Sequence, residues 1–345
     1  FFREPMMQRH LALLLYIGIS GLILFLVKAE WINAYIQIVI MFIGINIMLS
    51  TSLNLVNGYM GEFSCGHAGF MAVGAYATSI LSMWFFTDGN LFGNALFSPS
   101  LSVMLFPVTL LIGGMAAALV GLLVAIPSFK TRGDYLAIIT LAVNYIIKSA
   151  IENIQIIGGA RGFMGMRKVV NAMVETVPLP WVMIWILVFT GLTVAVLNRF
   201  VSSTFGKGLV AIRDDEIAAE IMSVNTQRMK LIAFMVSSGL AGIAGGLFAH
   251  VLGYINPGSF TIMKSTEIMV MVYLGGMGSL GGSVMSAILF TVLMEFLRPL
   301  QLFKWVLIPF LLIVMMMFRP EGIMGHRELT DVFPRLRRLF PSREA

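Results

Sequence analysis

The chain repeats apolar runs that are each about as long as a bilayer-crossing helix. A bilayer core about 30 Å thick needs roughly 20 helical residues. The runs cover about residues 11–27, 32–56, 67–86, 101–126, 135–151, 181–198, 231–253, 266–297 and 303–318. Only 12% of the 345 residues are charged, whereas soluble domains carry about a quarter. We therefore expect an all-α, polytopic integral membrane protein.

The run at 266–297 is long for one span and contains LGGMGSLGGS at 274–283. Its five glycines weaken a continuous helix, because each costs about 1 kcal/mol relative to alanine. We expect a helix break here and two short crossings, which brings the total to about ten.

Basic residues support ten crossings with both termini in the cytoplasm, because cytoplasmic loops are enriched in Lys and Arg. This topology places 15 of the 23 basic residues inside, including Lys130, Arg132 and six arginines from Arg319 onward. We expect one transmembrane domain over 1–345, with a cytoplasmic loop at 199–230 and a cytoplasmic tail at 319–345. The net charge of +6 is then a topology signal, and the expected surroundings are membrane lipid and not nucleic acid.

Small residues recur at helical spacing in two runs. Gly113, Ala117, Gly121 and Ala125 form one ridge, and Ser238, Gly242 and Gly246 form another. Such patterns let membrane helices approach closely, so we interpret both ridges as packing faces.

A second interruption, GYMGEFSCGHAGF at 58–70, separates two strongly apolar runs. Irregular backbone at membrane depth occurs only where protein or a water-filled cavity satisfies its polar groups. Transporters pair such breaks in corresponding halves of the chain, so we expect the breaks at 58–70 and 274–283 to line one translocation path. The candidate path residues are Asn54, Ser64, His67, Thr140, Asn144, Gly275 and Gly276. For His67, the alternative is a buried histidine that links helices.

The chain lacks the motifs of a catalytic or metal site. No G-x-x-x-x-G-K-[ST], H-E-x-x-H, Cys/His cluster or nucleophile elbow occurs. We therefore expect no enzymatic activity, no metal and no cofactor in this chain.

The densest charge cluster within the membrane region lies at 205–230. Its periodicity predicts one helix from about 208 to 222, with Leu209, Ile212, Ile217 and Ile221 on one side. A helix lying on anionic lipid should be basic, whereas four of the five charged residues between 213 and 220 are acidic, which favours docking to a protein. The candidate coupling residues are Arg213, Asp214, Asp215, Glu216 and Glu220.

This segment resembles the cytoplasmic coupling loop of ABC-importer permeases of the branched-chain amino acid family. The matching residues are Gly206, Ala211-Ile212-Arg213, Asp215-Glu216, Ala218-Ala219 and Ser223-Val224-Asn225. Ser223 stands where that family usually has glycine, so a less sharp turn is expected there.

Other segments resemble the M-type (LivM-like) permease subunits of the same family, in the same order. They are the stretch 52–78, RGDYLAIITLAV at 132–143, IGGARGFMG at 157–165, the stretch 255–282 and FRPEGIMG at 318–325. The resemblance implies an ABC-importer permease fold in a bacterial inner membrane. It also implies a second homologous permease, two ATPase subunits and a periplasmic binding protein as partners.

The implied substrate is leucine, isoleucine or valine. Urea and short-chain amide permeases share much of the pattern, and an ion-driven secondary carrier remains a further alternative. The loops at 152–180 and 254–265 would meet the binding protein, with Arg161, Arg167 and Lys168 as candidate contacts for its acidic patches. Arg161 stands where the family often has a small, acidic or amide residue.

Overall fold

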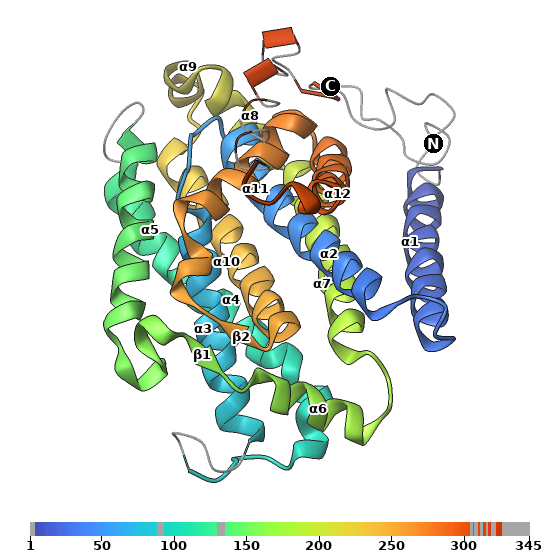
Figure 1. The fold of residues 1–345 in the computed structure, drawn as a ribbon. Helices are drawn as coiled ribbons and strands as arrows, with labels where there is room; N and C mark the ends of the chain where they lie inside the picture. Colours follow the sequence, from blue (N-terminus) through green and yellow to red (C-terminus); the bar gives the residue numbers. More distant parts are fainter. Residues whose placement is uncertain are drawn as a thin grey trace.

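The apolar runs form long helices in the computed structural model, which describes residues 4–87, 93–129 and 135–303 and scattered positions up to 325. Helices occur at each of the first eight runs expected above, and the run at 266–297 forms two of them (Figure 1). They are α1 (Glu4–Lys28), α2 (Ala34–Asn54), α3 (His67–Phe86), α4 (Ser102–Ser128), α5 (Tyr135–Asn153), α7 (Trp181–Val201), α10 (Thr226–Leu252), α11 (Ile262–Gly275) and α12 (Leu280–Phe296).

Six helices in the described part of the chain are long and apolar enough to cross a membrane. Two further apolar helices are shorter: the part of α1 from Leu14 to Lys28, and α12. The expected break between α11 and α12 is confirmed. With 14 and 17 residues, both are shorter than the roughly 20 residues that a full crossing needs. The last expected run, Lys130, Arg132 and most of the tail lie outside the described residues, so the count of ten stays a prediction.

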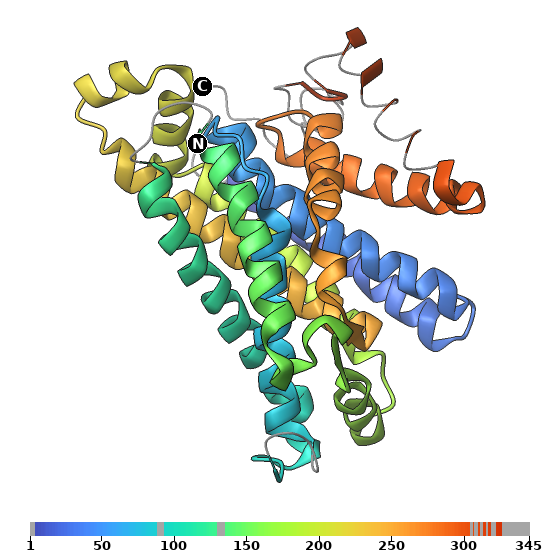
Figure 2. The same cartoon turned by 60° about the vertical axis from the view of Figure 1, so that its left-hand side comes forward.

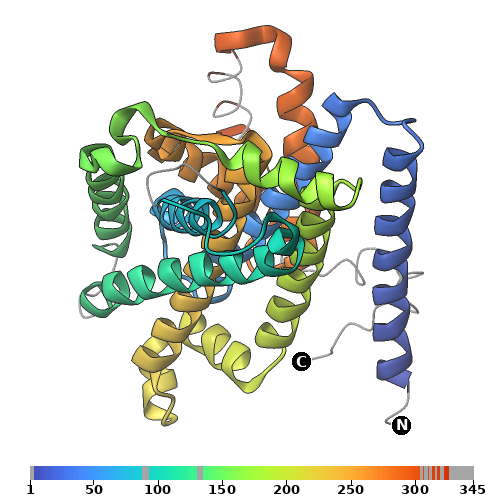
Figure 3. The ribbon, with the colours of Figure 1, turned by 90° about the horizontal axis from the view of Figure 1, so that it is seen from below.

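α10 is the central helix and packs against α4, α3 and α2. The two small-residue ridges are packing faces, as expected, and the structure shows that they face each other: a Cβ atom on Gly242 would lie 2.4 Å from the Cβ of Ala117. A Cβ atom on Gly121 would lie 2.1 Å from the Ser238 hydroxyl oxygen. α5 and α1 lie on opposite flanks of this core (Figures 1 and 3).

The two ends of the bundle carry different elements (Figures 1 and 2). One end holds the short helices α8 (Thr204–Asp214) and α9 (Glu216–Ile221). The other holds α6 (Met166–Thr176) and an antiparallel strand pair, β1 (Phe163–Met164) and β2 (Tyr254–Ile255). This pair joins the segments 152–180 and 254–265, which the sequence predicts to act together.

The prediction of a single helix over 208–222 is wrong, because Asp215 divides this segment into α8 and α9. Asp215 has an extended backbone, with φ −158° and ψ 109°. Its carboxylate accepts hydrogen bonds from the amides of Ile217 and Ala218, at 2.9 and 3.0 Å. It therefore ends α8 and caps α9 at the same point.

Ser223 keeps the sharp turn that glycine provides in the family. Its φ is +63°, a left-handed conformation that costs a residue with a Cβ atom roughly 1–2 kcal/mol. The expected loosening of this turn is therefore not found, and the serine carries the strain instead.

Ser223→Gly should stabilise the protein by about 1 kcal/mol, because glycine adopts the left-handed conformation without a Cβ clash. The measurement is the thermal unfolding midpoint of the purified protein. Ser202, with φ −78°, provides the matched control, since Ser202→Gly should lower stability by about 0.5–1 kcal/mol. Equal effects of the two substitutions would contradict the assignment of strain to Ser223.

Candidate functional site

The first break follows α2. The helix widens into a π-helical turn at Leu55–Tyr59, residues 60–66 are non-helical, and α3 begins at His67. Main-chain amides in the break form hydrogen bonds within the same segment. The Glu62 amide donates to the Val56 carbonyl at 3.1 Å, and the Ser64 amide donates to the Asn57 side-chain oxygen at 3.2 Å. Polar main-chain groups here are thus satisfied by protein, as membrane depth requires.

The second break separates α11 from α12. Gly276 and Gly278 have φ values of +112° and +80°, which glycine adopts readily. Ser279 caps α12 by accepting a hydrogen bond from the Gly282 amide at 3.0 Å. The segment FRPEGIMG also reaches this break, because the amides of Ile323 and Met324 donate to the carbonyls of Leu274 and Gly275 at 2.9 and 3.2 Å.

Asn54 joins the two breaks. Its buried amide nitrogen donates to the Ser279 carbonyl at 2.9 Å and to the Ser283 hydroxyl at 2.8 Å. Its amide oxygen accepts from the Gly278 amide at 3.0 Å. Gly58 completes the contact, since a Cβ atom there would lie 2.3 Å from the Gly278 nitrogen. The breaks therefore touch, which the expected shared path requires; the path itself stays a prediction.

α5 covers the first break from the other side through Thr140 and Asn144, which are both buried. The Cys65 amide donates to the Thr140 hydroxyl at 3.1 Å. The amide oxygen of Asn144 lies against Gly69. Among the described atoms, this oxygen and the buried hydroxyl of Ser64 have no hydrogen-bond partner. They are the predicted path residues with free hydrogen-bonding capacity.

His67 forms the helix link that the sequence leaves open as its alternative role. Its Nε2 atom lies 2.9 Å from the Ser52 hydroxyl, so the buried ring connects α3 to α2. The neighbouring Ala68 amide donates to the Ser265 hydroxyl on α11 at 3.0 Å. These contacts tie the start of α3 to both broken helices.

A three-residue ion network connects the first break to α9. The Lys230 ammonium, on α10, lies 2.6 Å from the Glu62 carboxylate and 2.8 Å from the Glu216 carboxylate. The lysine side chain is only 7% exposed, whereas Glu62 is 22% and Glu216 is 46% exposed. Sequence reasoning treats Lys230 only as a topology signal, because its two partners are distant along the chain.

Arg213 makes a second contact between this end and the first break. Its guanidinium Nη1 donates to the Gly58 carbonyl at 3.3 Å, and its aliphatic stem packs on Gly61. Its other pairing is with Asp214, at 3.1 Å. The α8–α9 segment therefore touches the irregular backbone directly.

The remaining predicted coupling residues have local roles. Asp214 is mostly exposed beside Arg213, and Asp215 caps α9. Glu220 accepts a hydrogen bond from the Thr226 hydroxyl at 2.9 Å. Of the predicted set, Arg213 and Glu216 are the residues that reach toward the break.

The apolar residues of this segment divide into two groups. Leu209 and Ile212 on α8 are buried against the bundle. On α9, Ile217 is 65%, Ile221 is 77% and the adjoining Met222 is 78% exposed. The single apolar stripe inferred from sequence is thus divided, and its second half faces outward.

The predicted binding-protein contacts gather at the opposite end. Arg161, Arg167 and Lys168 are exposed around β1 and the start of α6. The Tyr254 hydroxyl donates to the Arg161 carbonyl at 2.7 Å, and the Arg167 side chain covers Gly253. The strand pair and these contacts hold the three basic residues on one surface.

Gly58→Ala should disrupt the junction of the breaks, because the new Cβ atom would lie 1.9 Å from the Asn54 side-chain oxygen and 2.3 Å from the Gly278 nitrogen. Separating Asn54 from buried partners costs about 1–3 kcal/mol for each unsatisfied group. The expected result is a lower unfolding midpoint and lower yield of folded protein. Gly21→Ala is the matched control, since a Cβ atom there meets nothing within 4 Å, and it should be neutral. Wild-type stability of Gly58→Ala would disprove the tight contact.

Comparison with known proteins places this bundle among transport permeases. Residues 35–318 match the family model described as "Branched-chain amino acid transport system / permease component". The chain is 30% identical to the high-affinity branched-chain amino acid transport system permease protein LivM of Escherichia coli, over 81% of this chain and 68% of the relative.

Two shorter matches cover the same family. The chain is 29% identical to the permease protein LivH of Escherichia coli, over 43% of this chain and 48% of the relative. It is 29% identical to the permease protein BraD of Pseudomonas aeruginosa, over 45% of this chain and 52% of the relative. No solved structure matches the chain. The chain belongs to the family of branched-chain amino acid transport system permease components.

Proposed function

We propose that this chain is the membrane-spanning subunit of an ATP-driven importer that conducts branched-chain amino acids across a bacterial inner membrane. Its family and the names of its relatives support this proposal. The relatives include two differently named permeases of Escherichia coli, LivM and LivH, which supports a second homologous permease as partner. Two ATPase subunits bind at the α8–α9 end, and a periplasmic binding protein binds at the α6 end.

The observation that carries the proposal is the pair of contacts between the α8–α9 segment and the first break. Glu216 reaches Glu62 through Lys230, and Arg213 reaches the Gly58 carbonyl. A displacement of α9 by a partner therefore acts on irregular backbone, which lacks the regular hydrogen bonds of a helix. Rigid-body shifts of this kind open and close transporters, and ATP is bound by the partner and not by this chain.

The exposed apolar residues of α9 support a protein partner at this end. Ile217, Ile221 and Met222 stand beside acidic Glu216 and Glu220. Protein interfaces combine an apolar centre with a polar rim, whereas anionic lipid would repel the acidic residues. The basic residues at the α6 end suit an acidic surface on the binding protein.

Lys230→Met should uncouple ATP hydrolysis from transport, because it separates Glu62 from Glu216 and leaves a partly buried carboxylate without its cation. In the reconstituted complex we expect substrate-stimulated ATP hydrolysis and leucine uptake to fall about tenfold, within the usual range of coupling energies. Glu216→Gln should give a smaller loss, since Glu62 keeps its lysine.

Lys148 supplies the control for that experiment. It forms a partly exposed pair with Glu152 at 3.5 Å on α5, and ion pairs that water reaches contribute little. Lys148→Met should therefore leave uptake unchanged. Wild-type uptake and ATP hydrolysis in Lys230→Met would contradict the proposed coupling through Lys230. An equal loss of uptake in Lys148→Met would contradict it as well.

Ile221→Asp should prevent the ATPase subunits from co-purifying with this chain, because it places a carboxylate in the apolar centre of the proposed interface. Gln227→Asp adds the same charge at an exposed position on α10 and should preserve the complex. Retention of the ATPases by the α9 variant would exclude this surface.

Uptake assays separate the alternatives. A urea or short-chain amide permease would transport those compounds in place of leucine. An ion-driven carrier would transport with this chain alone under an ion gradient, and that result would reject the ATP-driven importer.

A further inference from the structure

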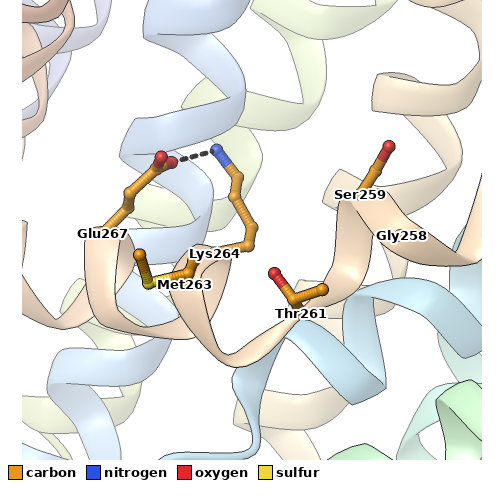
Figure 4. Close-up of a pocket in the computed structure, with 6 residues that line it drawn as sticks. All are labelled: Gly258, Ser259, Thr261, Met263, Lys264 and Glu267. Atoms are coloured by element: carbon orange, nitrogen blue, oxygen red, sulfur yellow. Dashed lines mark hydrogen bonds and ion pairs between the residues drawn. The ribbon is translucent and has the colours of Figure 1, made fainter. Parts of the chain in front are cut away.

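An ion pair lies in the first turns of α11, at the side of a pocket of about 370 Å³. The Lys264 ammonium is 2.9 Å from the Glu267 carboxylate, and the two side chains are only 19% and 16% exposed. Figure 4 shows them pointing toward each other above the turn of the chain that carries Thr261. The residues lining the pocket are Gly258, Ser259, Thr261, Met263, Lys264 and Glu267.

Stability does not account for this pair. Lys264 and Glu267 are three residues apart on one helix, so their ion pair connects no separate elements. Pairs at this spacing contribute about 0.2–0.5 kcal/mol, whereas placing charges in a membrane bundle costs several times more. Ionisable residues within membrane proteins usually serve a ligand or ion for this reason.

The pair has the donors and acceptors that a zwitterion requires. Lys264 offers three N–H donors to a carboxylate, and Glu267 offers two oxygens to an ammonium group. The Phe248 ring lies 6.0 Å from the Lys264 nitrogen, and exposed Met263 lines the opening, so apolar surface adjoins the charges. The volume lies near the lower end of the roughly 300–1,000 Å³ found for small-molecule sites.

We propose that this pocket binds the amino acid substrate during transport, with the substrate carboxylate on Lys264 and the substrate ammonium on Glu267. The aliphatic side chain lies toward Met263, which lines the pocket. This inference rests on the proposed function, because it assigns a site to the substrate of that importer.

The position of the pocket on α11 suits a site on the route to the breaks. α11 begins just after β2, at the end that carries α6, and ends at the glycines of the second break. Gly275 is eleven positions after Lys264, which is about 16 Å along a helix. A bound substrate is then held on the same rigid element that ends at the junction of the two breaks.

The headgroup of phosphatidylethanolamine is also zwitterionic. Its ammonium and phosphate are separated by a two-carbon bridge and an ester oxygen, whereas the charged groups of an α-amino acid share one carbon. The 2.9 Å separation of Lys264 and Glu267 therefore favours the more compact amino acid.

Thiol labelling tests the site. Cys65 is the single cysteine of the chain, so Met263→Cys in a Cys65→Ala background places one reactive thiol at the pocket. In the assembled transporter, in phosphatidylcholine vesicles, L-leucine should slow labelling by a maleimide at least fivefold. 4-Methylpentanoate and isoamylamine, which each keep one charge of leucine, should not protect.

Neutral variants establish that the charges hold the ligand. Glu267→Gln preserves size and should abolish protection by leucine, as should Lys264→Met. Gln227→Cys, at an exposed position of α10 outside both proposed interfaces, is the control and should be labelled at the same rate with and without leucine. Protection at Met263→Cys that survives both neutral substitutions would overturn the proposal.

Three further outcomes separate this inference from its alternatives. Slower labelling caused by phosphatidylethanolamine, without any effect of leucine, would assign the pocket to lipid and reject the proposal. ATP-driven leucine uptake without leucine protection would also reject the site while leaving the proposed function intact. Leucine protection without uptake or stimulated ATP hydrolysis would support the site and count against the proposed function.

Discussion

The hydrogen bonds of Asn54 are the interactions on which the centre of this membrane protein depends. Two helices stop inside the bundle, and lipid offers no partner to the polar groups that each interruption frees. One buried amide side chain at the end of α2 serves the carbonyl of Ser279 and the amide of Gly278 in the other break. The cost of interrupting two helices is thus reduced by joining the interruptions, and the glycines allow the close approach that the joining requires.

The joined breaks lie between two ends with opposite character. Acidic α9, with its exposed apolar residues, stands at one end, and the basic surface around α6 stands at the other (Figure 2). Contacts from Arg213 and Lys230 reach the first break, and α11 runs from the Lys264 pocket to the second. In the proposed importer the ATPases and the binding protein act at opposite ends of the bundle, and this arrangement gives each end its own connection to the centre.

Much of this architecture follows from local sequence. The apolar runs, the glycines at 274–283 and the small-residue ridges each express a local requirement of helices in lipid, and the structure confirms those that lie within the described residues. The boundary at Asp215 could not be predicted in this way. The apolar residues on both sides of Asp215 keep a helical spacing, and only the backbone conformation shows that its carboxylate caps a new helix. The sequence does not single out Lys230 or the Lys264–Glu267 pair as candidate site residues. Their proposed roles depend on burial of the charged side chains, and the role of Lys230 depends also on partners that are distant along the chain. The path and coupling roles of the predicted residues stay predictions.

Lys230 is shared by two carboxylates, and this sharing sets how α9 can move. In an isolated buried ion pair, separating the partners leaves both charges without solvent or a counter-charge, so separation is costly in free energy. Here Glu216, which is nearly half exposed, can leave for water while Lys230 remains neutralised by Glu62. In the proposed coupling, the network would transmit a displacement of α9 while Glu216 is paired, and it would open without leaving Lys230 buried and unpaired.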